Sequence, residues 1–381
     1  MENLADSTLQ QGEFSWRWAD ESDNDRLNEI FKSVSMKSDL HLGVERDPDF
    51  FALYKMQQCE QNVFSFDIAD KMEGCCTILV RDGYIDGEKK RIGYMGDMRL
   101  TKAMAGRGIV NRHYGHIFNQ FAEESGVDIF LTSVIESNKA AVGALVNRSP
   151  KYPHKPFYSP LRKFSIQNLQ FTTRKKPRKT PFTVRNATEA DIPMIATFLH
   201  EDQKKRQFGY VVTEDLLEFR LETWPGFEIE NFYLAFDGDQ LVGVTATWDA
   251  EQIKRFRILG YYKSMKWVKK GFNLASRFMG FEPLPDVGGT FRYFYLTHFS
   301  VPSENPEVMT ALVDRIYADY YGKGYHFFTL YVDREDPLKP ALERYRFTGL
   351  PAGLYAVSVA GHDHNERDFG SGRIGFEMAL V

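Results

Sequence analysis

The sequence contains few cysteines and no long apolar run. Cys59, Cys75 and Cys76 are odd in number and two of them are adjacent, which is typical neither of a disulfide framework nor of a zinc site. No stretch approaches the roughly 18 consecutive apolar residues that a membrane span needs. The first residues are acidic and polar, unlike a basic and then apolar leader. We therefore expect a soluble cytoplasmic protein with no metal centre.

An excess of positive charge is also missing. Lys and Arg number 48 against 52 Asp and Glu, a formal net charge of −4, so the overall charge does not favour a nucleic-acid partner. The hydrophobic content of 43% is that of an ordinary globular protein. The 381 residues exceed the roughly 250–300 at which a single core stops growing. The chain should therefore form two or more domains.

A short glycine-containing loop lies between a predicted strand and a predicted helix. Residues 91–100 have an extended pattern, Gly106-Arg107-Gly108 follow, and apolar residues recur at helical spacing from Ile109. Glycines let the backbone bend tightly and approach a ligand, and the helix turns its free N–H groups and positive dipole end toward the loop. This arrangement predicts a phosphate or pyrophosphate site. An ordinary strand-to-helix turn is the alternative, because Gly-x-Gly alone is weak evidence.

The loop has neither P-loop nor dinucleotide-binding spacing. It resembles the acetyl-CoA loop of the GNAT superfamily of N-acetyltransferases, whose pattern is Gln/Arg-x-x-Gly-x-Gly/Ala, although Ala103 stands where the Gln or Arg is expected. The family's second pattern, Asn-x-x-Ala, follows a predicted strand at residues 127–135 as Asn138 and Ala141. The two patterns occur in the family's order, each at a strand-to-helix junction.

This resemblance implies an α/β fold with a mixed sheet and an acyl-CoA co-substrate, most simply acetyl-CoA. The acceptor would be the amine of a small molecule or peptide. The residues expected to bind the cofactor are Met98, Arg99 and Leu100, whose main chain would pair with the pantetheine arm, the loop residues Gly106, Arg107, Gly108 and Ile109, and Asn138.

Catalysis needs a proton acceptor and a group that protonates the leaving thiolate. Asp97, on the strand before the loop, is the best candidate base, and a salt bridge or a surface turn carboxylate is the equal alternative. Leu145 stands at the position of the family's tyrosine, so Tyr152 is the substitute acid from the following turn. A thiolate can also leave unaided, since a thiol of pKa about 8.5 is a fair leaving group.

The chain repeats itself. Arg17-x-Ala19-x-Glu21-x-Asp23 returns as Arg185-x-Ala187-x-Glu189-x-Asp191, each before a predicted helix. We expect a GNAT domain at 1–171, a solvated basic linker at 172–182 and a second GNAT-like domain at 183–381. The second copy has Pro302-Ser303-Glu304-Asn305-Pro306-Glu307 in place of the glycine loop, which predicts that its CoA site is lost.

Local patterns predict similar elements in both halves. The first half should contain strands at 14–18, 62–68, 74–81, 91–100 and 127–135, a helix through Leu27, Ile30 and Phe31, a helix at 47–54, and two short extended pieces within 157–171. The second should contain strands at 231–236, 240–248, 291–301 and 326–332, a helix at 308–321, and a short helix ending at Tyr345.

One insertion, residues 249–289, has no counterpart in the first half. Its basic and apolar residues interleave, so an amphipathic helix there could lie on a membrane surface or cover an acidic or acyl substrate. The alternative is a pair of helices packed on the domain with an ordinary charged outer face.

These observations favour a CoA-dependent N-acyltransferase, with acetyl transfer carried by the first domain. A non-catalytic CoA-binding or regulatory tandem module is one alternative, because a fold does not guarantee an activity. Transfer from a long-chain acyl-CoA or an aminoacyl-tRNA is another.

Overall fold

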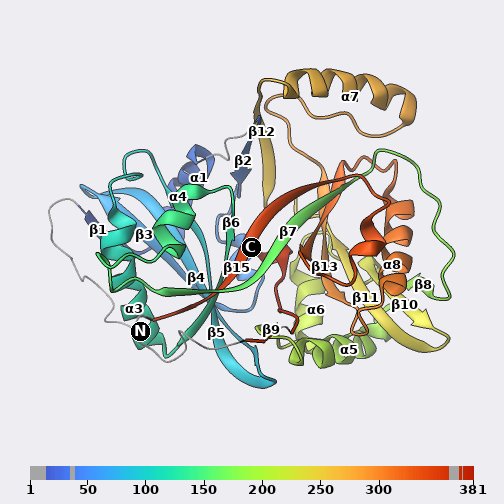
Figure 1. Cartoon of the computed structure of the whole chain (residues 1–381), viewed down its shortest axis with the longest axis horizontal. Coiled ribbons are helices and arrows are strands. Elements are labelled where there is room, and N and C mark those ends of the chain that lie inside the picture. Colours follow the sequence, from blue (N-terminus) through green and yellow to red (C-terminus); the bar gives the residue numbers. More distant parts are fainter. Residues whose placement is uncertain (1–13, 35–38, 360–368, 371) are drawn as a thin grey trace.

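A single mixed sheet runs through the molecule (Figure 1). The structure, a computed structural model, describes residues 14–34, 39–359, 369–370 and 372–381, so the polar stretch at 1–13 lies outside it. The strands follow the order β1 (Phe14–Trp18), β3 (Glu60–Ile68), β4 (Lys71–Ile85), β5 (Glu88–Leu100), β6 (Ile129–Ile135), β15 (Phe347–Ser358), β7 (Phe157–Gln170), β14 (Phe327–Asp333), β13 (Tyr293–Ser300), β11 (Gln240–Trp248), β10 (Phe232–Asp237) and β8 (Thr183–Asn186). The pairs β5–β6 and β13–β14 are parallel and the other neighbours are antiparallel. The mixed α/β architecture that the sequence predicts is confirmed.

The order of the strands is symmetric about the centre of the sheet. β1, β3, β4, β5 and β6 are matched by β8, β10, β11, β13 and β14. Both halves begin with the same ion pair, since Arg17 and Asp23 lie 2.7 Å apart, as do Arg185 and Asp191. A capping box follows each first strand, at Asp20 and at Thr188. The repeated sequence pattern therefore corresponds to a repeated structure.

The two halves exchange a strand at the centre of the sheet. β7 of the first half pairs with β14 of the second, from Gln170 opposite Phe327 to Phe164 opposite Asp333. β15 of the second half pairs with β6 of the first, and β7 and β15 pair with each other. Each half therefore depends on the other for its central strand.

Helices cover both faces of the sheet in the first half. Cys76 and Ile78 of β4 belong to the cluster under α3 (Gly115–Ser125), whereas Cys75 and Leu79 belong to the cluster under α1 (Asn24–Ser33). In the second half, α5 (Ile192–Lys204) and α6 (Glu214–Thr223) pack on one cluster and α8 (Pro306–Tyr320) on another. No helix within the described residues has the length and apolar character that crossing a membrane requires.

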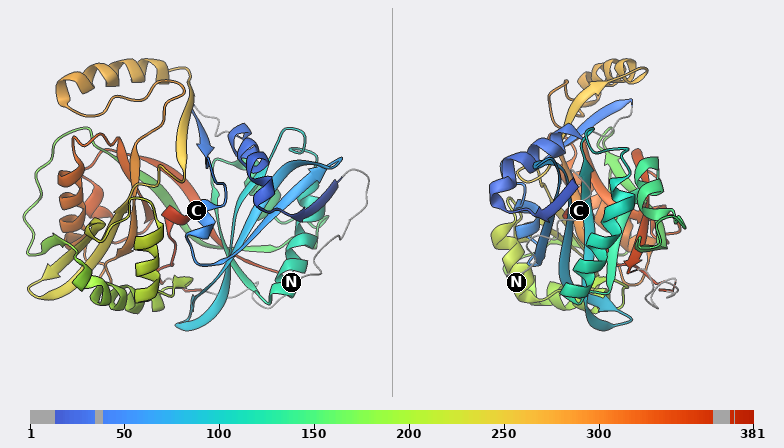
Figure 2. Two further views of the ribbon diagram at one scale, coloured as in Figure 1. Left: turned by 180° about the vertical axis from the view of Figure 1, so that it is seen from behind. Right: turned by 90° about the vertical axis from the view of Figure 1, so that its left-hand side faces the viewer.

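The basic insertion forms a strand and a helix, which corrects the expectation of helices alone. β12 (Arg255–Tyr261) pairs with β2 (Leu40–Glu45) of the first half, and Figure 2 shows the two side by side. α7 (Met265–Met279) follows and lies at the edge of the molecule (Figure 1). The strand was missed because alternating basic and apolar residues over so short a stretch fit either period.

The basic linker was expected to be freely solvated, but its residue Arg178 is docked on the second half. Arg178 donates to the two carboxylate oxygens of Asp314 on α8, at 2.9 and 2.8 Å, and its main-chain N–H donates at 2.7 Å. The side chain of Asp314 is 2% exposed. This ion pair therefore fixes the linker to the second half.

Two other local predictions fail, and one strand was missed. Within residues 47–54 the helix α2 (Ala52–Lys55) is only one turn long. Residues 157–170 form one long strand in place of two short pieces, because β14 and β15 pair with it on its two edges. β15 was not predicted at all.

Candidate active site

The parallel strands β5 and β6 part in the middle of the first half. Their pairing runs from Gly93 opposite Phe130 to Met95 opposite Thr132, where the Thr132 hydroxyl donates to the Met95 carbonyl at 2.7 Å. Beyond Met95, β5 has no partner on this side among the described strands, since β6 turns its other edge to β15. The main chain from Gly96 to Leu100 is therefore available to an extended ligand.

A β-bulge places Asp97 at the start of this opening. Gly96 lies opposite Thr77 and Arg99 opposite Cys75, so β5 holds one residue more than β4 between these pairs. Asp97 takes a φ of +53°, a left-handed conformation that aspartate tolerates better than most residues. The bulge occurs at the residue that the sequence singles out.

The Asp97 carboxylate belongs to a buried ion pair. Its Oδ2 accepts hydrogen bonds from the Arg46 guanidinium and the Tyr54 hydroxyl, each at 2.7 Å. Burial acts to raise the pKa of Asp97, but the positive charges of Arg46 and then Arg99 hold this pKa below its ordinary value. The structure therefore contains the salt bridge that was the alternative to a catalytic base. A carboxylate of low pKa is a weak proton acceptor. The role of Asp97 as a base stays a prediction.

The glycine loop adopts a conformation that requires glycine. Gly106 and Gly108 have φ values of +79° and +71°. A Cβ on Gly106 would meet no atom within 4 Å, whereas one on Gly108 would lie 3.0 Å from Arg112 Nη1. Helical structure begins at Ile109, first as a π-type turn (Val110–Tyr114) and then as α3. The first-turn N–H groups therefore face the loop.

Two arginines lie at this loop. Arg112 donates to the main-chain oxygen of Arg107 at 2.8 Å, and both side chains are exposed. The Ile109 side chain is buried in the core under α3, so it is the main chain of Ile109 that faces the loop. Arg112 was not predicted, although it follows Gly108 by one helical turn.

Asn138 and Tyr152 lie on other elements. The Asn138 side chain caps α4 (Lys139–Ala141) by accepting from Ala141 N at 3.1 Å. Tyr152 lies in the turn before β7, near Lys151 and with its ring 6.2 Å from that of His154. Among the described contacts none joins Tyr152 to Asp97, so the structure does not bring the two predicted catalytic residues together.

A large apolar cavity lies beside Asp97, between the two halves. We call it the central cavity; its volume is about 620 Å³ and both halves line it. Asp97, Arg46 and Arg99 are among its polar lining residues. Its apolar lining includes Leu42, Phe164, Ile166, Phe256, Phe291 and Phe327. A cavity of this size and character accommodates a sizeable apolar group.

Further polar groups of the central cavity were missed from the sequence. Tyr94 and Ser133 face each other across the parting strands, with their hydroxyl oxygens 3.3 Å apart. Burial raises the pKa of Tyr94, so its hydroxyl stays protonated at neutral pH. Lys254, 6% exposed, donates to the main-chain oxygen of Val381. Tyr94 could have been found from the sequence, because it precedes Asp97 by three residues on the same strand. Lys254 could not, because it lies far from Asp97 in the sequence.

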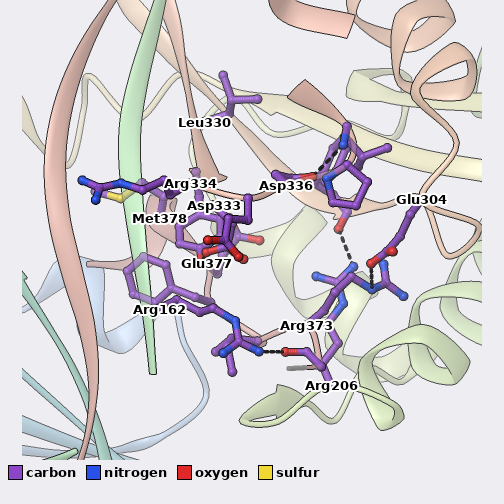
Figure 3. A pocket seen from close by; sticks show the side chains of 18 of the residues that line it. Arg162, Arg206, Glu304, Leu330, Asp333, Arg334, Asp336, Arg373, Glu377 and Met378 are labelled. Carbon is purple, nitrogen blue, oxygen red and sulfur yellow. Dashed lines mark hydrogen bonds and ion pairs between the residues drawn. The ribbon is translucent and has the colours of Figure 1, made fainter. Parts of the chain in front are cut away.

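A second cavity lies where the pairing of the parallel strands of the second half ends. Pairing of β13 with β14 ends at Tyr295 opposite Thr329, and a cavity of about 630 Å³ lies beyond. Figure 3 shows its charged lining, with Arg373 turned toward Glu304 at 3.5 Å. Burial raises the pKa of three lining carboxyls, Asp333, Asp336 and Glu377. The lining also holds five basic residues, Arg162, Lys163, Arg206, Arg334 and Arg373, so its charge does not decide whether it takes a pyrophosphate, and the loss of the second CoA site stays a prediction.

Comparisons with known proteins agree with this architecture. No protein-family model matches the chain, and no curated protein sequence does. Among solved structures, Saccharomyces cerevisiae N-myristoyltransferase with bound myristoyl-CoA is similar, with a TM-score of 0.61 and 7% identity over 92% of this chain and 80% of that one. A GCN5-related N-acetyltransferase from Sphaerobacter thermophilus has a TM-score of 0.54 and 12% identity, covering 97% and 98% of the two chains.

A third similar structure is a tandem GNAT protein from the clavulanic acid biosynthesis pathway. Its TM-score is 0.53 and its sequence identity is 8%, and the match covers 92% of this chain and 100% of that chain. At such identities the likeness is one of fold. The chain thus has the tandem GNAT fold that its sequence predicts.

Proposed function

We propose that the protein is a CoA-dependent N-acyltransferase whose donor site is the opening between β5 and β6. The observation that carries this proposal is the position of the glycine loop. The strands part beyond Met95, and the open strand leads to the loop and to the helix that begins at Ile109. A donor with its phosphates at the loop would have its thioester end near Gly96 and Asp97.

The loop main chain and two arginines would hold the donor phosphates. The N–H groups of Gly106, Gly108 and Ile109 would donate to phosphate oxygens, with Arg107 and Arg112 adding positive charge. The main chain of Met98–Leu100 would pair with the pantetheine amides as an added strand. Since the Asn138 oxygen is used in capping α4, its Nδ2 would be the group that donates to the cofactor.

In the reaction, the acceptor nitrogen attacks the thioester carbon, the C–N bond forms and the C–S bond breaks. The proton that the nitrogen loses ends on the CoA thiolate or in solvent. Asp97 would attract the amine to the thioester and orient it, because its carboxylate stays ionised beside Arg46. The Tyr94 hydroxyl would donate to the leaving sulfur, the role that the sequence predicted for Tyr152.

The central cavity favours a donor acyl group longer than acetyl. An acetyl group needs only a small part of about 620 Å³, and the apolar lining would stabilise each additional buried methylene. The similar N-myristoyltransferase structure contains myristoyl-CoA. We therefore propose a medium- or long-chain acyl-CoA, with acetyl-CoA and an apolar acceptor as the alternative use of the same space.

The acceptor class follows from the polar groups around Asp97. Arg99 Nε is buried and has no hydrogen-bond partner among the described residues. An amine that lies close to a carbonyl or carboxylate oxygen, as in an amino acid or peptide, would satisfy Asp97 and Arg99 together.

Release of free CoA thiol tests this function. Acyl-CoAs from acetyl to palmitoyl are incubated with the protein and a panel of amino acids and peptide amines. We expect amine-dependent thiol release that falls at least tenfold in Tyr94→Phe, because one hydroxyl is lost from the leaving-group side. Binding of acyl-CoA with no release of CoA thiol in the presence of any amine would instead indicate a non-catalytic CoA-binding module.

A further inference from the structure

The helix α7 is apolar on two sides, and the protein covers only one of them. On the inner side, Met265 and Phe272 line the central cavity. On the outer side, Trp267 is 73% exposed, Leu274 58% and Phe278 83%. Positions 267, 274 and 278 recur at helical spacing and form one row. Such a row on a well-formed helix is uncommon at a surface that faces only water.

A row of positive charge runs beside this apolar row. The residues Met265–Met279 include no Asp or Glu. Lys266, Lys270 and Arg277 are exposed and form no ion pair with the part of the chain that the structure describes. Helical spacing places all three on the side next to Trp267 and Leu274. Lys270 also lies 4.8 Å from the centre of the Trp267 ring.

We propose that α7 docks the protein on the surface of an anionic lipid bilayer. Trp267, Leu274 and Phe278 enter the boundary between headgroups and acyl chains, where tryptophan is enriched in membrane proteins. Lys266, Lys270 and Arg277 meet the lipid phosphates. Apolar and basic rows side by side on one helix are the pattern of helices that lie in a membrane interface.

The helix is held in a position suited to this role. It lies at the edge of the molecule, outside the sheet (Figures 1 and 2). Asn273 exchanges two hydrogen bonds with the main chain of Leu284, at 3.1 and 2.8 Å. The Tyr321 hydroxyl donates to the Met279 carbonyl at 2.9 Å. The outer row is therefore presented by a fixed helix, and its inner face opens on the cavity proposed to take an acyl group.

A second copy of the chain fits this face less well. In a twofold contact between two α7 helices, the same basic row would be present on both copies, with no carboxylate on either helix to offset it. An anionic bilayer offsets that charge.

Vesicle co-sedimentation tests the proposal and does not depend on catalysis. We expect the full chain to pellet with phosphatidylcholine vesicles rich in phosphatidylserine and to remain in the supernatant with phosphatidylcholine alone. A serine variant, which carries Trp267→Ser, Leu274→Ser and Phe278→Ser together, should no longer pellet. A glutamine variant, which carries Lys266→Gln, Lys270→Gln and Arg277→Gln together, should bind the vesicles about five-fold more weakly for each charge removed, on the order of a hundred-fold in all.

A matched variant removes three charges elsewhere. The triple variant Lys89→Gln, Lys204→Gln, Lys205→Gln acts at exposed positions near the start of β5 and at the end of α5. Figure 1 shows α5 on the side of the molecule opposite α7, and the binding of this variant should equal that of the wild type. In the wild type, brominated lipids should quench the fluorescence of the exposed Trp267.

Three results would overturn the proposal. The first is a wild type that stays in the supernatant with anionic vesicles, and the second is a serine variant that still pellets. The third is a lipid-free wild type that sediments as a dimer together with a serine variant that sediments as a monomer. This third result would make the face an interface between copies of the chain.

Discussion

Asp97 and His298 occupy the same position in the two halves of the sheet. Each is the left-handed residue of a β-bulge, with φ values of +53° and +52°, on the strand that leads into the open part of its half. Each faces an arginine, Arg46 at 2.7 Å and Arg220 at 2.6 Å. The backbone is the same while the side chain changes from a carboxylate to an imidazole, as expected if only one half keeps the donor site.

Asp97→Asn should destabilise the protein strongly. The change leaves the Arg46 guanidinium, whose side chain is 2% exposed, without its counter-charge. Breaking a buried ion pair from one side costs about 3 kcal/mol or more of the free energy of unfolding, which urea unfolding measures. Glu60→Gln, which breaks the exposed Arg91–Glu60 pair, should cost about 0.5 kcal/mol or less.

The effect of Asp97→Asn should also depend on pH. The pKa of Asp97 is lower in the folded protein than in the unfolded chain, so its contribution to stability is present above about pH 4. That contribution is lost as pH falls through the folded pKa. The difference between wild type and variant should therefore shrink in acid. A difference that grew in acid would mean that burial outweighs Arg46 and raises the pKa.

His298 should make the wild type less stable in mild acid. Burial, and then Arg220, holds the pKa of His298 well below its ordinary value, so the folded protein keeps the imidazole neutral. The unfolded histidine gains a proton near pH 6.5. Stability should therefore fall below about pH 6.5, by up to about 1.4 kcal/mol per pH unit from this residue. Urea unfolding of His298→Asn should show a slope shallower by that amount, and equal slopes would refute a neutral His298.

The two halves should not fold separately. A fragment of residues 1–171 lacks β15 beside β6, and a fragment of residues 172–381 lacks β7 beside β14. We expect neither fragment alone to show a cooperative unfolding transition by circular dichroism. Co-expression should yield an equimolar complex on size exclusion. Cooperative unfolding of the first fragment alone would show that the exchanged strands are dispensable.

Acyl-CoA affinity should increase with chain length. Each buried methylene contributes about 0.8 kcal/mol, so the dissociation constant should fall about fourfold per methylene until the central cavity is full. Ile166→Trp, which fills part of that cavity, should shorten the preferred chain. Leu241→Trp, outside the central cavity, is the control. An acetyl-CoA affinity equal to that of the longer thioesters would assign the cavity to the acceptor.

Local patterns predicted much of the fold. The repeated Arg–Asp spacing, the glycine loop and the order of strands and helices depend on residues close in sequence, and each appears in both the sequence and the structure. The exchange of β7 and β15 between the two halves could not be predicted in this way. Their partners lie far along the chain, and periodicity does not indicate which edge a strand joins.

Only those parts of the candidate site that depend on residues close in sequence could be predicted. The main chain of the glycine loop is such a local feature, whereas the contacts of Asp97 with its partners are not. Arg46 lies 51 residues before Asp97 in the sequence, and Tyr54 lies 43 residues before Asp97. Nothing in the sequence around either residue marks it as a partner of Asp97. The central cavity is assembled from both halves, so it exists only once the sheet is complete.

The most direct test is calorimetric titration of octanoyl-CoA and myristoyl-CoA into the wild type, Gly106→Glu and Gly238→Glu. Both glycines have a positive φ, +79° and +56°, and open space at the Cβ position. The two changes therefore cause similar backbone strain and add the same charge, but only Gly106 lies in the loop. We predict that the wild type and Gly238→Glu bind alike and that Gly106→Glu loses at least tenfold in affinity, because its carboxylate repels the phosphates. No binding to the wild type, or equal binding to all three proteins, would contradict a donor site at this loop.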